Sequence, residues 1–358
     1  MEAAERNRPD DLLASDGRGL FCSAGGFHID PWKKVPLAII THAHADHARP
    51  GCGKYIASQS CVPLLRSRLG ADIDIRPLAY GEFLTLGRTR VSLHPAGHIR
   101  GAAQVRVEAA SGEVWIAAGD YKRQSDASAE QFEVVKCDVF ITEATFALPV
   151  YRFPDPVEVV REIREWWRSC AERGKPAVLF SYSLGKTQRV LAELQRLDQL
   201  PETPVLLHGA ALELTELYRE QGVAMLKTTP APEHKRGKRL GPCLAIAPPA
   251  AAGGPWMRRF GSSTAFETGF ASGWSRIRGM RRRANHDRGF VLSDHADWND
   301  IIRTVRDTGA RRVLCTHGST VPLARYLKEK GWDAEVLNTK YEGESGADAT
   351  PGSSEAGG

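Results

Sequence analysis

In Leu37-Ala-Ile-Ile-Thr-His-Ala-His-Ala-Asp-His47, a buried-strand pattern runs directly into three histidines and an aspartate within six residues. Side chains two residues apart in an extended chain point the same way, so His42 and His44 can converge on one cation. Asp46 and His47 lie where we expect the chain to turn into a helix, and they can face a second cation. Imidazole and carboxylate ligands without thiolates suit Zn²⁺, Mn²⁺ or Fe²⁺. The alternative is a polar loop rich in histidine by chance, but so dense a cluster after a buried strand favours a metal site.

The composition is that of an ordinary globular enzyme. The chain has 358 residues, a length sufficient for two domains or for one domain with a large insertion. Of these residues, 42% are hydrophobic and 25% are charged, as in ordinary globular proteins. No apolar stretch approaches the roughly 18 residues that a membrane span requires. Residues 1–11 also lack the apolar core of a signal peptide. We therefore expect a cytoplasmic protein that does not associate with membranes.

Cysteine usage and net charge add two weaker indications. The seven cysteines are scattered and include no Cys-x-x-Cys pair, which predicts reduced, mostly buried thiols and no zinc knuckle. The net charge of +5 and the sequence pI of about 8.8 mildly favour a polyanionic partner. Many enzymes with small substrates share these values, so the distribution of charge matters more than its sum.

The pattern of apolar residues predicts an α/β protein and divides the chain into several parts. Short apolar runs broken by Gly and Pro predict a strand-rich first part; they are Phe27–Ile29, Leu37–Thr41, Arg90–His94, Gln104–Val107, Val114–Ala118 and Val139–Thr142. Helical periodicity begins near Asp155 and lasts to Glu172, and a parallel strand–helix repeat follows, with strands at Ala177–Ser181 and Val205–His208 and helices at Lys186–Leu197 and Leu212–Gln221.

The rest of the chain alternates between loop and regular structure. We expect loop from Pro230 to Gly261 with one buried strand, Cys243–Ala247. A strand near Phe290 is followed by a helix, a strand and a helix, at Ile301–Asp307, Arg312–Thr316 and Val321–Lys330. The Gly-, Ser- and Ala-rich tail, residues 342–358, is predicted to be disordered.

The motif Thr-His-Ala-His-Ala-Asp-His resembles the HxHxDH signature of the metallo-β-lactamase superfamily, and further motifs of that superfamily follow in order. Asp30, at the end of Phe-His-Ile-Asp, matches the aspartate that braces the metal site from outside the ligand shell. His98, in Pro-Ala-Gly-His, matches the third metal histidine. Asp120, in Ala-Gly-Asp-Tyr, matches the carboxylate that bridges two metals.

Three more motifs resemble those of the β-CASP nucleases within that superfamily. They contain Glu143 in Ile-Thr-Glu-Ala-Thr, His295 in Leu-Ser-Asp-His-Ala-Asp, and His317 in Leu-Cys-Thr-His-Gly. The resemblance implies that His317 is the last ligand of the second metal. It also implies that His295 is the general acid that protonates the leaving oxygen and that Glu143 orients it. A loop histidine with a purely structural role is the alternative for His295.

The resemblance covers roughly residues 10 to 340 and is closest to the bacterial ligase-associated DNA exonucleases. The stretches that carry it include Asp-Pro-Trp, Thr-Glu-Ala-Thr-Phe-Ala-Leu-Pro-Val-Tyr, Ser-Tyr-Ser-Leu-Gly-Lys-Thr-Gln and Arg-Gly-Phe-Val-Leu-Ser-Asp-His-Ala-Asp-Trp. It implies a DNA exonuclease of DNA repair, associated with an ATP-dependent DNA ligase and a helicase. RNA-directed β-CASP members also carry a histidine at the position of His317, so the motifs leave DNA and RNA both open.

The same resemblance implies an αββα sandwich interrupted by an α/β β-CASP domain. Residues 1–150 and 291–341 would form the metallo-β-lactamase domain and residues 151–290 the inserted domain. Two divalent metal ions, Zn²⁺ or Mn²⁺, would bind to His42, His44, Asp46, His47, His98, Asp120 and His317. Asp46 and Asp120 would share the catalytic work with His295 and Glu143.

Two basic regions are candidates for nucleic-acid backbone contacts. Gly185-Lys-Thr opens a helix directly after a strand, where backbone N–H groups and Lys186 favour an anion; the candidates there are Ser183, Lys186 and Thr187. A nucleotide-binding P-loop is rejected, because its first glycine would fall at Phe180. The arginine run after Trp274 supplies Arg278, Arg281 and Arg282, which form either a nucleic-acid clamp or an ordinary solvated face.

Three other functions remain as alternatives. A β-CASP ribonuclease in RNA processing or decay would use the same metal site. A hydrolase of small acyl or thioester substrates would not need the large α/β insertion. A degenerate nuclease that serves as a scaffold would have lost metal ligands, and none is lost in this sequence.

Overall fold

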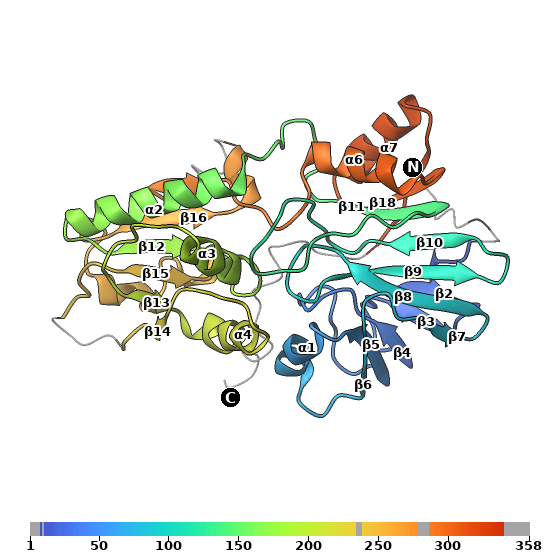
Figure 1. Cartoon of the computed structure of the whole chain (residues 1–358), viewed down its shortest axis with the longest axis horizontal. Helices are drawn as coiled ribbons and strands as arrows, with labels where there is room; N and C mark the ends of the chain where they lie inside the picture. Colours follow the sequence, from blue (N-terminus) through green and yellow to red (C-terminus); the bar gives the residue numbers. More distant parts are fainter. Residues whose placement is uncertain (1–7, 9–10, 234–237, 278–285, 340–358) are drawn as a thin grey trace, which may run out of the picture.

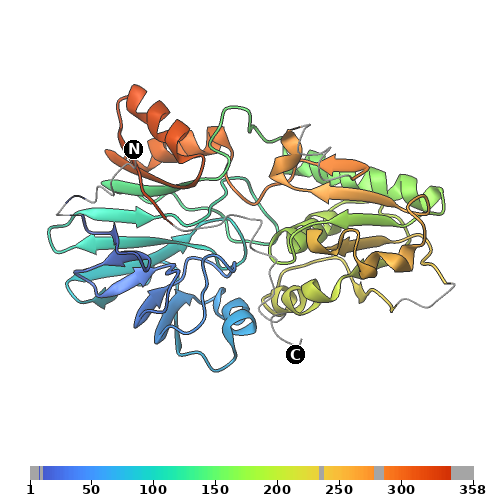
Figure 2. The same ribbon diagram turned by 180° about the vertical axis from the view of Figure 1, so that it is seen from behind.

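A computed structural model of the chain describes residue 8 and residues 11–233, 238–277 and 286–339. These residues form three β-sheets with helices packed beside them, so the mixed α/β class expected from the sequence is confirmed. Figures 1 and 2 show two lobes side by side, with the first two sheets in one lobe and the third sheet in the other. We call these the metal-site lobe and the inserted lobe.

The first sheet is built from the beginning of the chain, with its strands in sequence order. The strands β1 and β2 pair antiparallel, as do β2 and β3, whereas β3 to β6 are parallel. The helix α1 (Val62–Leu69) connects β5 to β6. The bounds are β1 (Ala14–Ser15), β2 (Leu20–Cys22), β3 (Phe27–Ile29), β4 (Leu37–Ile39), β5 (Lys54–Ser58) and β6 (Ile75–Leu78).

The second sheet combines strands from the middle and the end of the described chain, in the order β19-β18-β11-β10-β9-β8-β7. The helices α6 (Trp298–Thr308) and α7 (Thr320–Glu329) flank β18 in the sequence. Apolar side chains of both sheets, such as Ile39 and Val105, form one buried cluster, which ties the two sheets together. The bounds are β7 (Leu84–Leu86), β8 (Thr89–Pro95), β9 (Ala103–Ala109), β10 (Val114–Ala117), β11 (Val139–Ala144), β18 (Arg312–Gly318) and β19 (Asp333–Val336).

The third sheet is parallel throughout, in the order β14-β13-β15-β12-β16-β17. Its strands are β12 (Ala177–Phe180), β13 (Val205–Leu207), β14 (Thr229–Pro230), β15 (Leu244–Ala247), β16 (Glu267–Ala271) and β17 (Arg288–Phe290). Parallel neighbours need crossover connections, which here include α3 (Lys186–Gln195) and α4 (Gly209–Glu220). The 3₁₀ helices η1 (Pro249–Ala251) and η2 (Pro255–Phe260) lie between β15 and β16, and η3 (Gly273–Arg276) follows β16.

The helix α2 (Pro156–Glu172) leads into this sheet, and its local sequence explains both of its ends. Asp155 caps the N-terminus by accepting a hydrogen bond from the backbone N–H of Val157, and Pro156 occupies the first helical position. Its buried face carries Val159, Val160, Ile163, Trp166, Trp167 and Cys170, close to the stripe that the sequence predicts.

The structure corrects the sequence predictions in a few places. The segment after His44 forms a single turn, in which the backbone N–H groups of His47 and Ala48 both donate to the His44 carbonyl, and the chain does not continue from it into a helix. Several strands of two to five residues and one helix are not predicted from the sequence, among them β1, β2, β5, β6, β16, β19 and α1. The predicted disordered tail lies outside the described residues.

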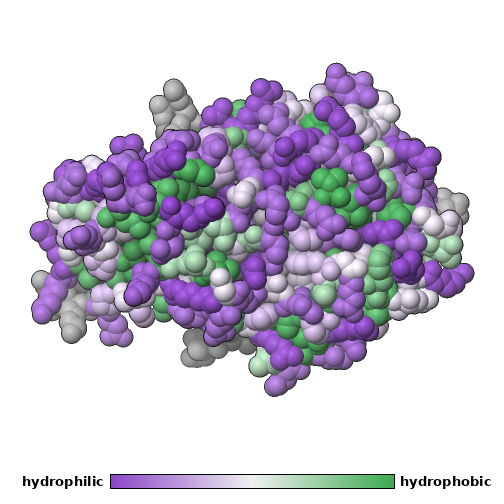
Figure 3. All heavy atoms as spheres, in the orientation of Figure 1, coloured by the Kyte–Doolittle hydropathy of each residue, from purple (hydrophilic) through white to green (hydrophobic). Residues whose placement is uncertain are grey.

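The surface and the thiols agree with the composition. Hydrophilic side chains cover most of the face in Figure 3, and hydrophobic ones form separate patches. In the described part of the chain, no helix is long and apolar enough to cross a membrane. The seven cysteines are free, and five of them are buried, as predicted.

We expect Trp167→Ala to destabilise the inserted lobe by about 3–5 kcal/mol, because a large buried side chain would leave a cavity. Trp167 is 2% exposed, and its indole N–H donates to the hydroxyl of Thr203. Val157, on the same helix, is 40% exposed, so Val157→Ala is the matched control. Urea unfolding followed by circular dichroism measures both, and equal shifts of the two variants would contradict this packing.

Candidate metal centre

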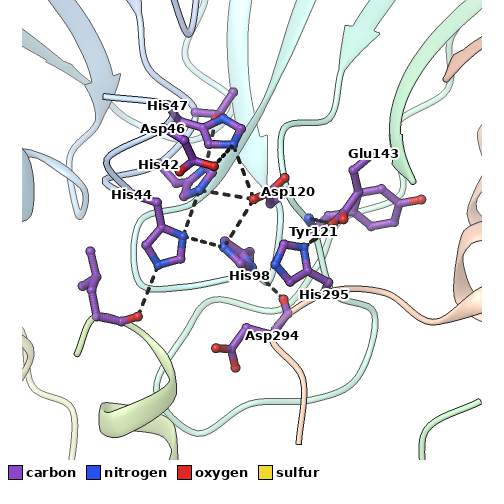
Figure 4. A network of polar contacts seen from close by, with 12 residues as sticks. His42, His44, Asp46, His47, His98, Asp120, Tyr121, Glu143, Asp294 and His295 are labelled. Atoms are coloured by element: carbon purple, nitrogen blue, oxygen red, sulfur yellow. Dashed lines mark hydrogen bonds and ion pairs between the residues drawn. The ribbon is translucent and has the colours of Figure 1, made fainter. Parts of the chain in front are cut away.

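The histidine-rich turn, the His98 loop and the Asp120 loop meet at one end of the two sheets of the metal-site lobe. Figure 4 shows His42, His44, Asp46 and His47 facing His98 and Asp120 across a small space, with His295 and Glu143 beside them. All of these side chains are 7% exposed or less. Strands end just before most of them, so the sheets fix the backbone from which each side chain projects.

Asp30 organises the start of the turn from behind. One carboxylate oxygen of Asp30 accepts the backbone N–H of Thr41 at 2.8 Å, and the other accepts the Thr41 hydroxyl at 2.5 Å. That second oxygen also lies 2.8 Å from Nδ1 of His47. Asp30 has a φ of 41°, a left-handed conformation that costs a residue with a Cβ of order 1 kcal/mol. The strain is consistent with an aspartate held in place for its hydrogen bonds.

In each of three histidines, one ring nitrogen faces away from the other histidines and contacts an acceptor. We call it the outer nitrogen of the ring and the other one the inner nitrogen. Nδ1 of His98 donates to the carbonyl oxygen of Asp294 at 2.7 Å, and Nε2 of His44 donates to the carbonyl oxygen of Leu184 at 3.2 Å. Nδ1 of His42 lies 3.0 Å from the Thr41 hydroxyl, whose own proton goes to Asp30. A carbonyl oxygen only accepts, so these contacts fix the proton on the outer nitrogen of each ring.

The inner nitrogens of the same rings therefore carry lone pairs, and they converge. Nε2 of His42 and Nε2 of His98 each lie 3.1 Å from Nδ1 of His44. Lone pairs this close repel each other unless a cation lies among them. Around a tetrahedral Zn²⁺ with bonds of about 2.0–2.1 Å, neighbouring ligand atoms lie about 3.3–3.4 Å apart. The three imidazoles thus fit a divalent cation in both spacing and protonation.

Asp120 connects this group to a second one. Its Oδ2 lies 3.5 Å from Nε2 of His42 and 3.8 Å from Nε2 of His98. The same oxygen lies 3.4 Å from Nε2 of His47 on the other side. The second group, Asp46, His47 and His317, has ligand atoms that all lie within 4.8 Å of one another. One carboxylate between two ligand groups is the arrangement of a two-metal site.

Burial and charge act differently on the histidines of the two groups. Burial lowers the pKa of His42, His44 and His98, which keeps their rings neutral and able to bind a metal. Burial also acts to lower the pKa of His47, but the carboxylates of Asp120 and Asp46 outweigh it and raise that pKa. The negative charge around His47 therefore attracts a cation, whether a proton or a metal ion.

His295 and Glu143 form a pair beside the first group. The Glu143 carboxylate accepts from Nδ1 of His295 at 2.8 Å and from the backbone N–H of Tyr121 at 2.8 Å. Nε2 of His295 therefore points away from Glu143, and the His295 ring lies 4.6 Å from that of His98 between centroids. A histidine held in this way can transfer a proton next to a metal-bound substrate.

The structure brings together every residue that the sequence assigns to the metals, to the brace and to the acid pair. His317, the last of them, has a φ of 59°, and its ring stacks on that of His47 at 6.0 Å. Asp30, His295 and Glu143 lie at the distances given above. These geometric findings agree with the assigned roles, and the roles themselves stay predictions.

The residues assigned to nucleic-acid contacts are either buried in polar contacts within the protein or outside the described residues. Lys186 is buried, with Nζ 3.6 Å from a carboxylate oxygen of Asp294 and 4.5 Å from the centre of the Tyr182 ring. The Thr187 hydroxyl bonds within the turn, to the carbonyl oxygen of Tyr182. Ser183 is also buried, at 8% exposure. Arg278, Arg281 and Arg282 lie outside the described residues. The phosphate contacts of all six residues stay predictions.

Sequence reasoning missed the partners that orient the ligands. Leu184 and Asp294 act through backbone carbonyls, which leave no trace in the residue type. Arg189, Lys122 and Asp126 form buried ion pairs near the site, although charged residues in a loop and on a helix suggest solvated positions. Asp294 and Leu184 do lie within quoted motifs, Ser-Asp-His-Ala-Asp and Ser-Tyr-Ser-Leu-Gly-Lys-Thr-Gln, but the motifs do not indicate that their carbonyls orient histidines.

The chain is similar to known proteins along most of its length. It is 32% identical over 335 residues to a probable DNA ligase of Opitutus terrae, which covers 93% of this chain and 32% of that protein. It is 28% identical over 237 residues to a ribonuclease of Thermus thermophilus, which covers 55% of this chain and 54% of that protein. The chain thus spans about a third and about half of the length of these two relatives.

Two further comparisons complete this result. A crystal structure of a protein of unknown function from Enterococcus faecalis superposes with a TM-score of 0.57 at 12% identity. The superposition covers 94% of this chain and 90% of that one, which shows a shared fold. No model of a protein family matches the chain.

We expect the wild-type chain to bind two divalent ions and His317→Ala to retain one. The substitution removes a ligand of the second group and leaves His42, His44 and His98 intact. His94→Ala is the control, because His94 bonds to Ser92 and Glu133 outside these groups. Elemental analysis after gel filtration in zinc-containing buffer counts the ions; two tightly bound ions in His317→Ala would contradict the grouping.

Proposed function

Because the chain belongs to the β-CASP family of metallo-β-lactamase-fold nucleases, we propose that it is a metal-dependent phosphodiesterase that degrades DNA from an end during repair. The observation that carries this proposal is the pair of ligand groups joined by Asp120, with the His295–Glu143 pair beside them. Two cations for the phosphate and one proton donor for the leaving oxygen are what phosphodiester hydrolysis requires.

The arrangement of the three sheets in two lobes supports this proposal. We assign the first two sheets to the αββα sandwich of the family, formed by residues 1–150 and 291–341. Their shared buried cluster supports the assignment. We assign residues 151–290 to the β-CASP domain, since all strands of the third sheet lie between Ala177 and Phe290. Two lobes with the metal site near their junction suit a polymeric substrate better than a small one.

In this proposal, the metal ligands and the His295–Glu143 pair have separate roles in phosphodiester hydrolysis. Divalent ions, Zn²⁺ or Mn²⁺, supply Lewis acidity and an activated water when they are bound. Asp120 offers a carboxylate between the two groups and Asp46 offers one to the second group. The rings of His42, His44 and His98 present nitrogen lone pairs to the first group. Glu143 holds the His295 ring so that Nε2 faces the site and can release its proton to the leaving oxygen.

The relatives support both DNA and a second candidate substrate, RNA. In the Opitutus relative, a region similar to nearly all of this chain lies in one polypeptide that is named a probable DNA ligase. A nuclease that trims DNA ends next to a ligase would prepare those ends for joining, so we propose a functional association with a DNA ligase. The helicase association rests on resemblance alone. The Thermus relative is a ribonuclease, which makes RNA processing or decay the second candidate.

We expect the purified chain to release nucleotides from end-labelled DNA faster than from RNA of the same sequence. Single- and double-stranded forms of both, labelled at either end, are compared on denaturing gels with Mn²⁺, Mg²⁺ or Zn²⁺. Asp120→Ala serves as the inactive control, because it removes the carboxylate shared by both groups. Equal or faster cleavage of RNA would favour the second candidate, and cleavage only at internal positions would contradict an exonuclease.

We expect His295→Ala to slow hydrolysis of DNA by about 10²–10⁴-fold, the usual contribution of a general acid. A nitrophenyl ester of thymidine monophosphate has a leaving group that needs no protonation, so the same variant should hydrolyse it at nearly the wild-type rate. His94→Ala controls for removal of an imidazole elsewhere. An equal loss on both substrates would show that His295 does not act as the acid.

A further inference from the structure

Five charged side chains are buried where the two lobes meet. They are 0–4% exposed, and we call them the interlobe ion cluster: Lys122, Asp126, Lys186, Arg189 and Asp294. Lys122 and Asp126 belong to the loop that follows Asp120, whereas Lys186 and Arg189 lie on α3 of the inserted lobe. Asp294 lies on the segment that returns from the inserted lobe to the metal-site lobe.

Arg189 is the centre of this cluster. Its Nε lies 3.3 Å from Oδ2 of Asp126, and its Nη1 lies 3.3 Å from Oδ1 of Asp294. Nη1 also donates to the carbonyl oxygen of Ser293. The planar fork of an arginine can hold two partners in fixed directions, which an ammonium group cannot. Arg189 thus joins the Asp120 loop, α3 and the returning segment through one guanidinium group.

Two of those joined segments supply the acceptors that orient metal-site histidines. The carbonyl oxygen of Asp294 accepts the outer N–H of His98, and the carbonyl oxygen of Leu184 accepts the outer N–H of His44. Leu184 precedes Gly185, the residue that caps α3. The histidines belong to the metal-site lobe, but these acceptors come from the inserted lobe and its return.

The same junction is tightly packed. Gly185 has a φ of 90°, and a Cβ at this position would lie 2.3 Å from Cγ2 of Ile99, the residue after His98. The start of α3 therefore lies directly against the His98 loop. A small displacement of α3 would move the Leu184 carbonyl relative to His44.

We propose that Arg189 is a positioning residue for the metal centre, which holds α3 and the returning segment so that Leu184 and Asp294 fix the rings of His44 and His98. This inference rests on the proposed metal site. It assigns to the inserted lobe a direct part in metal affinity, in addition to covering a substrate. Partners that orient metal-binding histidines change metal affinity by about 10–100-fold when they are lost.

The charges of the cluster allow a substitution that separates positioning from simple charge loss. Lys122 and Lys186 pair with Asp126 and Asp294, so the cluster without Arg189 contains two positive and two negative groups. Burial raises the pKa of Asp126, but Lys122 and Arg189 outweigh it and lower that pKa to about 2. Arg189→Met therefore removes the bridge, keeps a similar volume and leaves a balanced set of ion pairs.

The test compares zinc affinity in wild type, Arg189→Met and Arg189→Lys by competition with a chromophoric chelator. We expect about 10–100-fold weaker binding in Arg189→Met and a smaller loss in Arg189→Lys, which keeps the charge without the fork. Arg196→Met is the matched control, since Arg196 follows α3 and its side chain is 64% exposed. Wild-type affinity in a folded Arg189→Met variant would overturn the proposal.

A second measurement uses only the wild-type chain. Coupling between two sites is reciprocal, so zinc should slow hydrogen exchange in residues 181–195 as well as in residues 41–47. Protection confined to the histidine turn would overturn the positioning role even if Arg189→Met failed to fold. A wild-type chain that binds no zinc would instead refute the proposed metal site, which keeps the two failures distinguishable.

Discussion

The structure depends on the convergence of three imidazole lone pairs, which is unfavourable unless a cation lies among them. Nε2 of His42 and Nε2 of His98 each lie 3.1 Å from Nδ1 of His44. Each ring must be held by an acceptor on its outer side, because a rotated ring or the other tautomer would relieve the repulsion and lose the site. The strained backbone of Asp30 follows from the same requirement, since its carboxylate must reach both Thr41 and His47.

That requirement explains why the two lobes cannot be independent. The acceptors of His44 and His98 lie outside the strands that carry the histidines, so the inserted lobe must dock closely. The helix α3 is buried along nearly its whole length, although six of its ten residues are polar or charged. Buried charges are tolerated only when they are paired, and removal of one partner typically costs about 3–5 kcal/mol. Each charged group of the interlobe ion cluster lies within 3.6 Å of an opposite charge, and we expect these pairs to favour the docked arrangement.

The sequence predicts the parts of this design that depend on side-chain type and period. The ligands of the metal groups follow buried strands and stand in short motifs, so both the strands near them and the clustering of their side chains can be anticipated. Helix α2 is found because its apolar stripe is long. Strands of two or three residues, such as β1 and β2, are too short to show a period. The carbonyls of Leu184 and Asp294 are invisible for another reason, because every residue has one and only the docking of the lobes selects these two.

The same reasoning explains why the metal centre alone is compatible with relatives of two kinds. The groups around Asp120 and His295 address a phosphate and a leaving oxygen, which DNA and RNA share. A protein distinguishes the two polymers at the sugar, through contacts to the 2′-hydroxyl or through the shape of the strand. Such contacts must come from surfaces away from the ligand groups. The Leu184 carbonyl that contacts His44 belongs to the inserted lobe, and we expect the contacts that read the sugar to come from the same lobe.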